Sequence, residues 1–313
     1  MEFKEYYIKL YNEYCKLSCN DICCYNFLNT KDTILGRSGF EITECQPLSC
    51  AKVELIIIIS HQNRVVLNKL KDKVYLFIRE DQVASSEIIE CIILAVFERI
   101  MQLKGFFSIH ASAVELNGQA IVFVGDKESG KTSSAIGLCL EKKAKLIAND
   151  HVYLWIKNNM LFCGYGDGKK KIALRSHAIA KMNYNMGVHL FGDDIKKDGV
   201  RKKADVSELG IEVIESNVTV EKIICVGLGK ADTPIFKCLN ETEGNLILYR
   251  NIIRVIRGSS LVLFNTNRMF DTFLPDFSCD ITMRNLDRLL AFTGNIQLLY
   301  DYKGPLEGLI SKF

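Results

Sequence analysis

The sequence has little net charge, few prolines and no long apolar run. Its 313 residues include 40 basic and 37 acidic side chains, so bulk electrostatics give no reason to expect a nucleic-acid partner. The longest apolar runs, VELIIIIS and EIIECIILAVF, are too short to cross a bilayer. The first residues mix charge with tyrosine and lack the apolar segment of a secretory leader. We therefore expect a cytoplasmic protein with no membrane partner.

Internal repeats, low-complexity tracts and linkers rich in proline or serine are absent as well. The length allows one large domain or two modest domains with a sizeable core. The hydrophobic content of 48% and the charged content of 25% are those of an ordinary globular protein. The pattern predicts an N-terminal α+β segment, residues 1–84, for substrate or partner contact, followed by a larger domain, residues 85–313.

The sequence contains twelve cysteines, and because we expect a cytoplasmic protein, free thiols are favoured over disulfides. Cys15, Cys19 and Cys23 recur every four residues, a spacing that would stack them on one face of a helix, with Cys24 beside them. A metal site is one interpretation, but C-x3-C-x3-C-C is not a usual zinc spacing and no histidine lies nearby. A buried stripe of small apolar side chains is the favoured alternative.

The first part of the chain predicts a short opening helix followed by strands. KVELIIIIS and NRVVLNKL flank a polar turn, and KVYLFIRE follows. The stretch SSEIIECIILAVFERIMQLKG then predicts a buried helix, capped by Ser85 or Ser86 and ended by Gly105.

From residue 106 the predicted elements alternate in type. FFSIHASAVEL and QAIVFVG read as strands joined by an Asn117-Gly118 hairpin turn. A helix over about 131–143, the strand AKLIAND and two strands around Asn158-Asn159 follow. VEKIICVGLG and PIFKCLN predict further strands, and EGNLILYRNIIRVI and MRNLDRLLAFTG predict helices. This order predicts a mixed α/β core instead of a plain βαβ array.

A phosphate-binding loop is the strongest motif. It has the form G-x-x-x-x-G-K-T, with an apolar strand before it and a helix after it. The glycines let backbone N–H groups point at phosphate oxygens, the lysine brings positive charge to the β and γ phosphates, and the threonine offers a hydroxyl to Mg²⁺. The predicted nucleotide-binding residues are Gly125, Asp126, Lys127, Glu128, Ser129, Gly130, Lys131, Thr132 and Ser133.

The strand LIAND ends at Asn149 and Asp150, only 18 positions after Lys131. Asp150 is the first candidate for holding Mg²⁺ or accepting a proton, against the alternative of a carboxylate that caps a turn. Asn149 could ligate a metal through its carbonyl oxygen but cannot act as a base at neutral pH. It fits a natural variant that relies on Asp150, a weakened enzyme, or an engineered change that traps a complex.

This order of motifs along the chain resembles that of the HPr kinase/phosphorylase group and, more distantly, that of the nucleotide-dependent phosphoenolpyruvate carboxykinases. The likeness covers about residues 85–260 and rests on His110, the loop Gly125–Thr132 and Asn149-Asp150. It implies a mixed-sheet P-loop core unlike the doubly wound NTPase sheet. It also implies ATP and Mg²⁺ as cofactors, and transfer of the γ-phosphoryl group to a serine hydroxyl of a protein.

The resemblance further implies a histidine near the transferred phosphate at His110. It implies an Asp-Asp pair after the loop, but Asn149 replaces its first member here. A glycine-rich signature similar to EIRGLGI is missing, and VIRGSSLVLF is only a faint echo, which argues against HPr itself as substrate. Small HPr-kinase-like proteins, some of which phosphorylate ribosomally made peptides, are more similar. Such proteins are often oligomers, and the sequence leaves the oligomeric state open.

Several polar residues near the motif are further candidates. His110, in a strand before the loop, could act as a general acid or contact phosphate, or could be a core histidine. His151 is a weaker candidate, expected on the opposite face from Asp150. Arg175 could bind phosphate or an acidic peptide, together with Lys169 to Lys171 on a glycine-rich loop; a solvated charged loop is the alternative for the lysines.

The sequence thus predicts an ATP- and Mg²⁺-dependent kinase that acts on a hydroxyl, most simply serine, of a peptide or protein. Its catalytic candidates are Asp150, His110, Lys131, Asn149 and Arg175, and its metal candidates are Thr132 and Asp150. A nucleotide-binding scaffold or sensor without catalysis is the alternative, supported by Asn149. A carboxykinase acting on a small acid is a third interpretation, although such enzymes are usually longer.

Overall fold

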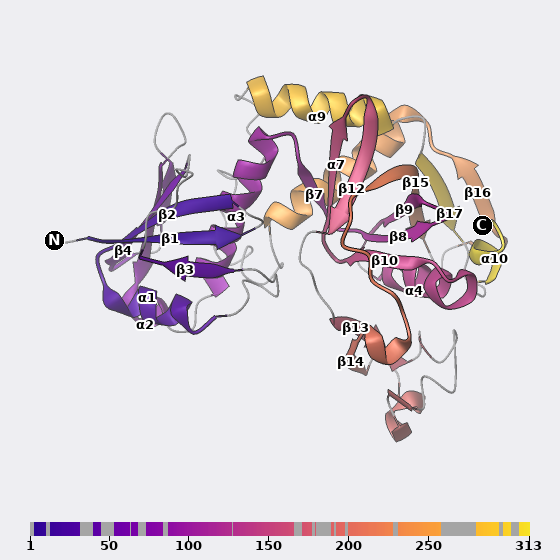
Figure 1. The fold of residues 1–313 in the computed structure, drawn as a ribbon, viewed down its shortest axis with the longest axis horizontal. Helices are drawn as coiled ribbons and strands as arrows, with labels where there is room; N and C mark the ends of the chain where they lie inside the picture. Colours follow the sequence, from indigo (N-terminus) through magenta and orange to yellow (C-terminus); the bar gives the residue numbers. More distant parts are fainter. Residues whose placement is uncertain are drawn as a thin grey trace. The chain divides into compact units, whose positions relative to one another are not determined.

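Two mixed β-sheets, each with its own helices, organise the chain in the computed structural model (Figure 1). The structure describes residues 3–10, 13–31, 40–44, 53–62, 64–67, 73–83, 87–126, 128–165, 171–176, 179, 189–190, 192–197, 200–227, 231–257, 280–293, 297–301 and 307–313. Unit 1 comprises Met1–Phe107 and Ile253–Leu286, and unit 2 comprises Ser108–Ile252 and Asp287–Phe313. The predicted mixed α/β class is confirmed.

Unit 1 contains a six-stranded sheet in the order β3-β1-β2-β4-β6-β5. The strands are β1 (Lys4–Leu10), β2 (Glu13–Cys19), β3 (Glu41–Thr43), β4 (Glu54–Ser60), β5 (Arg64–Leu67) and β6 (Lys73–Arg79). β2, β4 and β6 run parallel, and the other pairs are antiparallel. The helices are α1 (Ile22–Asn29), α2 (Glu80–Val83) and α3 (Glu87–Leu103).

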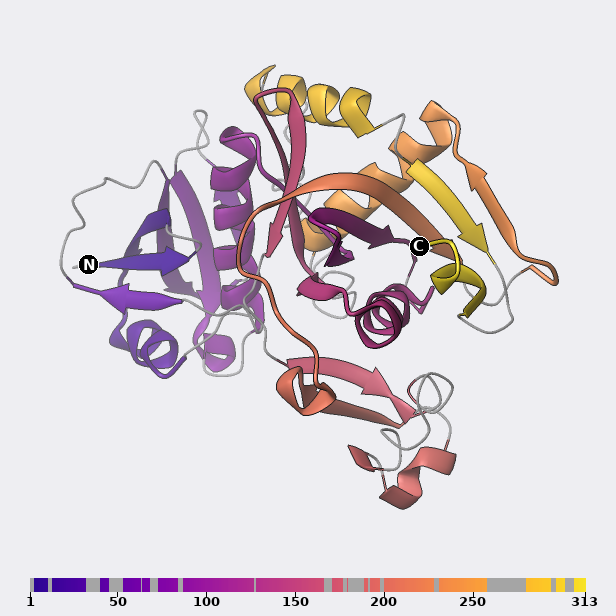
Figure 2. The ribbon, with the colours of Figure 1, turned by 45° about the vertical axis from the view of Figure 1, so that its right-hand side comes forward.

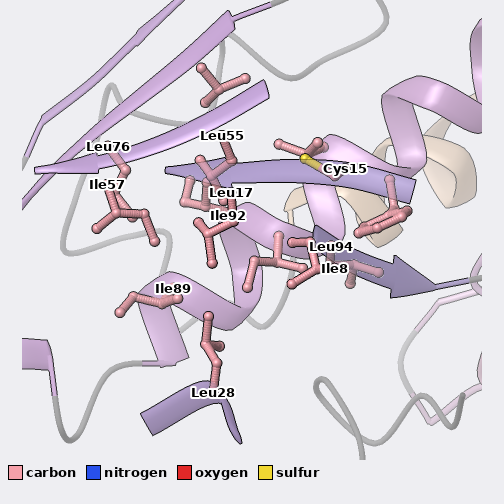
Figure 3. Packing of buried hydrophobic residues seen from close by; sticks show 14 of the residues in the cluster. Ile8, Cys15, Leu17, Leu28, Leu55, Ile57, Leu76, Ile89, Ile92 and Leu94 are labelled. Carbon is pink, nitrogen blue, oxygen red and sulfur yellow. The ribbon is translucent and has the colours of Figure 1, made fainter. Parts of the chain in front are cut away.

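One face of this sheet forms the core of unit 1 (Figure 3). Burial alternates along β1, β4 and β6, as expected for strands with one covered face. Leu55 and Ile57 of β4 and Leu76 of β6 lie with Ile89 and Ile92 of α3 in the same cluster. The apolar side chains of α3 thus complete a sheet-on-helix core.

The predicted opening helix is wrong, because the chain begins with the antiparallel pair β1–β2. Cys15 and Cys19 lie on β2 and Cys24 lies on α1, and all three thiols are buried. A spacing of four puts side chains on one face of a strand as well as of a helix, so the cysteine pattern fits both. A hydrogen bond from Cys24 lowers the pKa of the Cys19 thiol.

Among the described residues, no cluster of three or more His, Cys, Asp or Glu side chains could hold a metal ion. The side chain of Cys23 lies outside the described set. The burial of Cys15, Cys19 and Cys24 agrees with the expected apolar stripe, which lies on a strand and a helix instead of on one helix.

Helix α3 packs within unit 1, which extends to Phe107, whereas the expected domain boundary lies at residue 84. The reason is the apolar character of α3, whose apolar side chains between Ile89 and Phe97, together with Ile100, belong to the core of unit 1. Its end at Gly105, with a φ of 83°, agrees with the predicted glycine stop. The predicted caps Ser85 and Ser86 lie outside the described residues.

Unit 2 is built on a nine-stranded sheet whose main path is β10-β8-β9-β15-β12-β11-β7. The strands are β7 (Phe107–Ile109), β8 (Ser112–Leu116), β9 (Gln119–Val124), β10 (Lys145–Asn149), β11 (Val152–Lys157), β12 (Met160–Tyr165), β15 (Val218–Gly227), β16 (Ile235–Cys238) and β17 (Gln297–Asp301). β17 pairs with both β15 and β16, and its residues were not predicted as a strand from the sequence.

The predicted hairpins of unit 2 are confirmed. β8 and β9 are antiparallel around Asn117 and Gly118, whose φ angles of 54° and 85° suit a two-residue hairpin turn. β11 and β12 form a second hairpin around Asn158-Asn159. Helix α4 (Lys131–Lys142) packs against β8, β9 and β10 (Figures 1 and 2).

The remaining elements are an arm of unit 2 and several helices, two of which contain residues of both units. They are the two-stranded arm of β13 (Lys171–Arg175) and β14 (Arg201–Asp205), the short helices η1 (Gly192–Lys196), η2 (Ser207–Leu209) and α10 (Glu307–Ile310), and the helices α7 (Glu241–Arg257) and α9 (Asp280–Thr293). A second core combines α4 with side chains of β8, β9, β15 and the arm. Among the described helices, none is both long and apolar enough to cross a membrane.

Candidate functional site

The order of three strands brings the sequence motifs of unit 2 together at the edge of the sheet where β9 and β10 end and β8 begins. β8 pairs antiparallel with both β9 and β10, so β9 and β10 run in the same direction with β8 between them. The start of β8 at Ser112 therefore lies opposite Phe123 on one side and Asn149 on the other. The glycine loop that follows β9, the Asn149-Asp150 pair and His110 consequently meet at this edge.

The glycine loop has a backbone that requires its first glycine. Gly125 adopts a φ of 146°, and a Cβ there would come within 2.7 Å of both the Ser129 hydroxyl and the Val226 backbone oxygen. Gly130 has a φ of 99° and Glu128 a φ of 67°, so the loop turns twice through left-handed conformations before α4 begins. Lys127 lies outside the described residues.

The loop leads into the N-terminus of α4. Among the described residues, no side chain forms a capping hydrogen bond to this 12-residue helix at Gly130. The Ser129 hydroxyl is buried and has no hydrogen-bond partner among the described residues. Buried donors of this kind at a helix N-terminus suit an anion such as phosphate.

Lys131 bends back over the loop. Its Nζ donates to the backbone oxygens of Gly125 at 3.1 Å and Asp126 at 2.8 Å, and the residue is 6% exposed. The ammonium group therefore lies inside the curve of the loop, where a phosphate chain would have to pass. Ser133 follows in the first turn of α4, and Ser134 closes that turn by donating to the Gly130 oxygen.

Asn149 contacts the loop threonine directly. Its Oδ1 accepts hydrogen bonds of 2.8 Å from the Thr132 hydroxyl and from the Ser112 hydroxyl. Asn149 is 6% exposed and Ser112 is fully buried. The sequence pointed to Asn149 and Thr132 but not to Ser112, whose only signal was a small polar residue at the start of a strand.

Asp150 and His151 diverge after Asn149. Asp150 has a left-handed φ of 68°, a conformation that aspartate tolerates better than most residues. This turn leaves the Asp150 side chain exposed, whereas Asn149 and His151 are buried on either side of it. The carboxylate is thus open to solvent immediately beyond Thr132 and its amide partner.

His110 is held at the same edge by two backbone contacts. Its N–H donates to the Asn251 oxygen at 3.2 Å, and its ring Nδ1 lies 3.1 Å from the Asp150 backbone oxygen. A carbonyl oxygen only accepts, so this contact places a proton on Nδ1.

Arg175, at the end of β13, reaches the loop by an ion pair with Glu128. In the sheet register it stands opposite Arg201 of β14, so two guanidinium groups share one face of the arm. Gly166, Gly168, Lys169 and Lys170 lie outside the described residues, as does the side chain of Lys171. The expected role of the lysines therefore stays a prediction.

Arg250 is a neighbour of the loop that the sequence did not reveal. Its guanidinium lies 3.3 Å from the Asp126 carboxylate, and both side chains are more than 60% exposed. The adjacent Asn251 is the residue that accepts the His110 N–H, so α7 contacts both sides of the site. A separation of 124 positions between Arg250 and Asp126 leaves no local pattern from which the pair could be read.

Mg²⁺ would find its protein oxygens at Thr132 and Asp150. Magnesium is usually bound by one or two protein ligands together with phosphate oxygens and water, so two such groups suffice beside a nucleotide. Asn149 would support such an ion indirectly, through Thr132, because its Oδ1 already accepts two hydroxyl hydrogens. The donor set therefore fits a nucleotide-bound magnesium ion better than a metal site formed by protein groups alone.

Comparison with known proteins gives little beyond this geometry. No protein family matches the chain, and no curated protein matches it. Among solved structures it is similar to the HPr(Ser) kinase/phosphatase from Coxiella burnetii, at 17% sequence identity and a TM-score of 0.26. That likeness covers 42% of this chain and 77% of the other. A TM-score this low carries no argument, so the function is argued from the side chains.

Proposed function

We propose that this protein is an ATP- and Mg²⁺-dependent phosphotransferase that moves the γ-phosphoryl group to a hydroxyl, most simply serine, of a peptide or protein. The observation that carries the proposal is the contact between Thr132, in the glycine loop, and Asn149, at the end of β10. It joins a phosphate-binding loop to a polar strand end, which is the arrangement that phosphoryl transfer requires. The family resemblance of the motifs, with its mixed-sheet P-loop core, agrees with it.

Each residue has a physical role in this proposal. The N–H groups of the loop and the Ser129 hydroxyl donate hydrogen bonds to phosphate oxygens. Lys131 leaves the backbone oxygens of the loop and neutralises charge on the β and γ phosphates. Mg²⁺, when bound, neutralises further charge on these phosphates. Thr132 and Asp150 are the residues that would hold it.

The transfer itself requires one bond exchange and one proton movement. The substrate hydroxyl oxygen bonds to the γ-phosphorus, and the bond from that phosphorus to the bridging oxygen of ADP breaks. The hydroxyl proton passes to one oxygen of the Asp150 carboxylate, whose other oxygen would hold Mg²⁺. His110, whose ring lies against the Asp150 backbone oxygen, and Arg175, which pairs with Glu128 of the loop, contact the transferred group. Positioning and charge neutralisation supply most of the rate, so the loss of a carboxylate at Asn149 is tolerable.

The proposal is tested by incubating the protein with ATP, Mg²⁺ and a library of serine-containing peptides, followed by mass spectrometry. Lys131→Ala should lower phosphorylation by about 100-fold or more, because a preorganised charge at the phosphates is removed. Lys142→Ala is the matched control, since it removes an exposed lysine from the other end of α4. Equal phosphorylation by both variants would exclude the proposed site.

A nucleotide-binding scaffold without catalysis is the second candidate, and Asn149 is the observation that favours it. An uncharged amide at this position weakens the attraction for a divalent cation. Calorimetry would then show ATP binding, while no peptide gains phosphate. Asn149→Asp separates the two functions: an enzyme is active before this change, and a scaffold is not.

A further inference from the structure

The Asn149 amide is held between two hydroxyl groups. Ser112 Oγ and Thr132 Oγ1 each donate to Asn149 Oδ1 at 2.8 Å, one from the β8 side and one from the loop. Ser112 is fully buried and Asn149 is 6% exposed, so neither group has bulk water as an alternative partner. The two hydrogen bonds therefore determine how the amide is oriented.

Orientation matters for an amide and does not matter for a carboxylate. An amide has one accepting oxygen and one donating NH₂ group, whereas both oxygens of a carboxylate accept. If the Asn149 amide turned over, its NH₂ group would donate a hydrogen bond to the Thr132 oxygen. That bond would occupy a lone pair of the Thr132 oxygen that a cation needs. The buried Ser112 hydroxyl proton would also lose its acceptor, which costs free energy.

We propose that Ser112 is a positioning residue that keeps the Asn149 carbonyl oxygen on Thr132, so that the lone pairs of the Thr132 hydroxyl face the magnesium ion of Mg-ATP. This inference rests on the proposed function and explains how an amide serves where a carboxylate is expected. Thr132 donates its single hydroxyl hydrogen to Asn149, so the lone pairs of its oxygen remain available to bind the cation. Ser112 makes no contact with nucleotide or metal in this scheme and acts through Asn149 alone.

The test is a double-mutant cycle with ATP as the probe. Ser112→Ala is made in the natural sequence and together with Asn149→Asp, and the Kd of ATP is measured by calorimetry with Mg²⁺ and with EDTA. We expect Ser112→Ala to weaken Mg-ATP binding about tenfold when Asn149 is present and less than about threefold when it is replaced by Asp. ATP binding in EDTA should change by less than about twofold in both backgrounds, because no cation then depends on Thr132.

Thr293→Val is the matched control, because it removes an equally buried hydroxyl in α9 that donates to the Leu290 oxygen. It should leave ATP binding unchanged with and without Mg²⁺. Thermal unfolding of each protein without nucleotide shows whether it folds. If Ser112→Ala does not fold, Ser112→Cys keeps the side-chain volume with a weaker donor, and the same dependence on background is expected with a smaller amplitude.

The inference is overturned if Ser112→Ala weakens Mg-ATP equally in both backgrounds, or equally in Mg²⁺ and EDTA, since either result describes a purely structural serine. Failure of the proposed function gives a different result. In that case the unaltered protein binds no ATP in either condition, and the inference falls with it.

Discussion

Replacement of Gly125 by alanine should damage unit 2 more than replacement of any glycine that merely has a positive φ. Gly118 provides the comparison, because it has a φ of 85° and the space that an alanine Cβ would take there is open to 4 Å. Gly118→Ala therefore incurs only the left-handed backbone penalty of about 1 kcal/mol. Gly125→Ala combines a φ of 146° with 2.7 Å approaches to the Ser129 hydroxyl and the Val226 backbone oxygen.

The close approach to the Val226 backbone oxygen determines how much stability Gly125→Ala loses. Ser129 can rotate its side chain away, but the Val226 oxygen belongs to β15, which pairs with β9 and β17 and cannot shift alone. Adding an overpacking cost of about 1–3 kcal/mol to backbone strain of about 1–3 kcal/mol gives a loss of about 2–6 kcal/mol for Gly125→Ala. For a unit of this size, each 1 kcal/mol lowers Tm by about 2–4 °C.

Differential scanning calorimetry of the two variants measures this difference. ATP binding, measured well below both transitions, should be lost in Gly125→Ala and kept in Gly118→Ala, because only the former displaces loop donors. Equal shifts in Tm, or undiminished ATP affinity in Gly125→Ala, would refute the account of the loop given above.

Three other results are expected. Arg250→Gln should change stability by less than about 1 kcal/mol, because its ion pair with Asp126 is exposed, but should weaken ATP binding several-fold in calorimetry by leaving that carboxylate uncompensated beside the phosphates. Burial raises the pKa of the Cys139 thiol from 9.0 to about 12, so the unfolded thiol ionises first. The free energy of unfolding should fall as pH rises from 9 towards 12, and Cys139→Ala should flatten this slope in denaturant titrations. With iodoacetamide at about pH 8, mass spectrometry should find the exposed Cys238 alkylated well before Cys139.

The part of the site that lies on neighbouring elements could be predicted from the sequence. The hairpin turn at Asn117-Gly118, helix α4 and the strand that ends at Asn149 all carry local signals. Their order makes a close approach of Thr132 and Asn149 the natural outcome, and the structure places the two side chains 2.8 Å apart. The chemical roles of these residues stay predictions.

The sequence could not reveal contacts that depend on distant segments. Arg250 and Asp126 approach only because α7 packs beside the loop, and no periodicity links them. The prediction of a helix at the start of the chain was wrong for another reason. Cys15 and Cys19 are four positions apart, and that interval fits both one face of a helix and one face of a strand. The partners of β1 and β2 in the sheet settle the ambiguity, and both β3 and β4 come from later, separate segments of the chain.

The position of β8 between β9 and β10 has a consequence for how the site forms during folding. Ser112, Thr132 and Asn149 belong to one continuous segment, in which Ser112 and Asn149 are 37 positions apart and are joined by a hairpin and one helix. Closing such short loops costs little chain entropy, so these contacts can form early. Arg250 and Asn251 arrive only after a far longer loop has closed. Pulse-labelled hydrogen exchange would then show protection of β8 and β9 before that of α7.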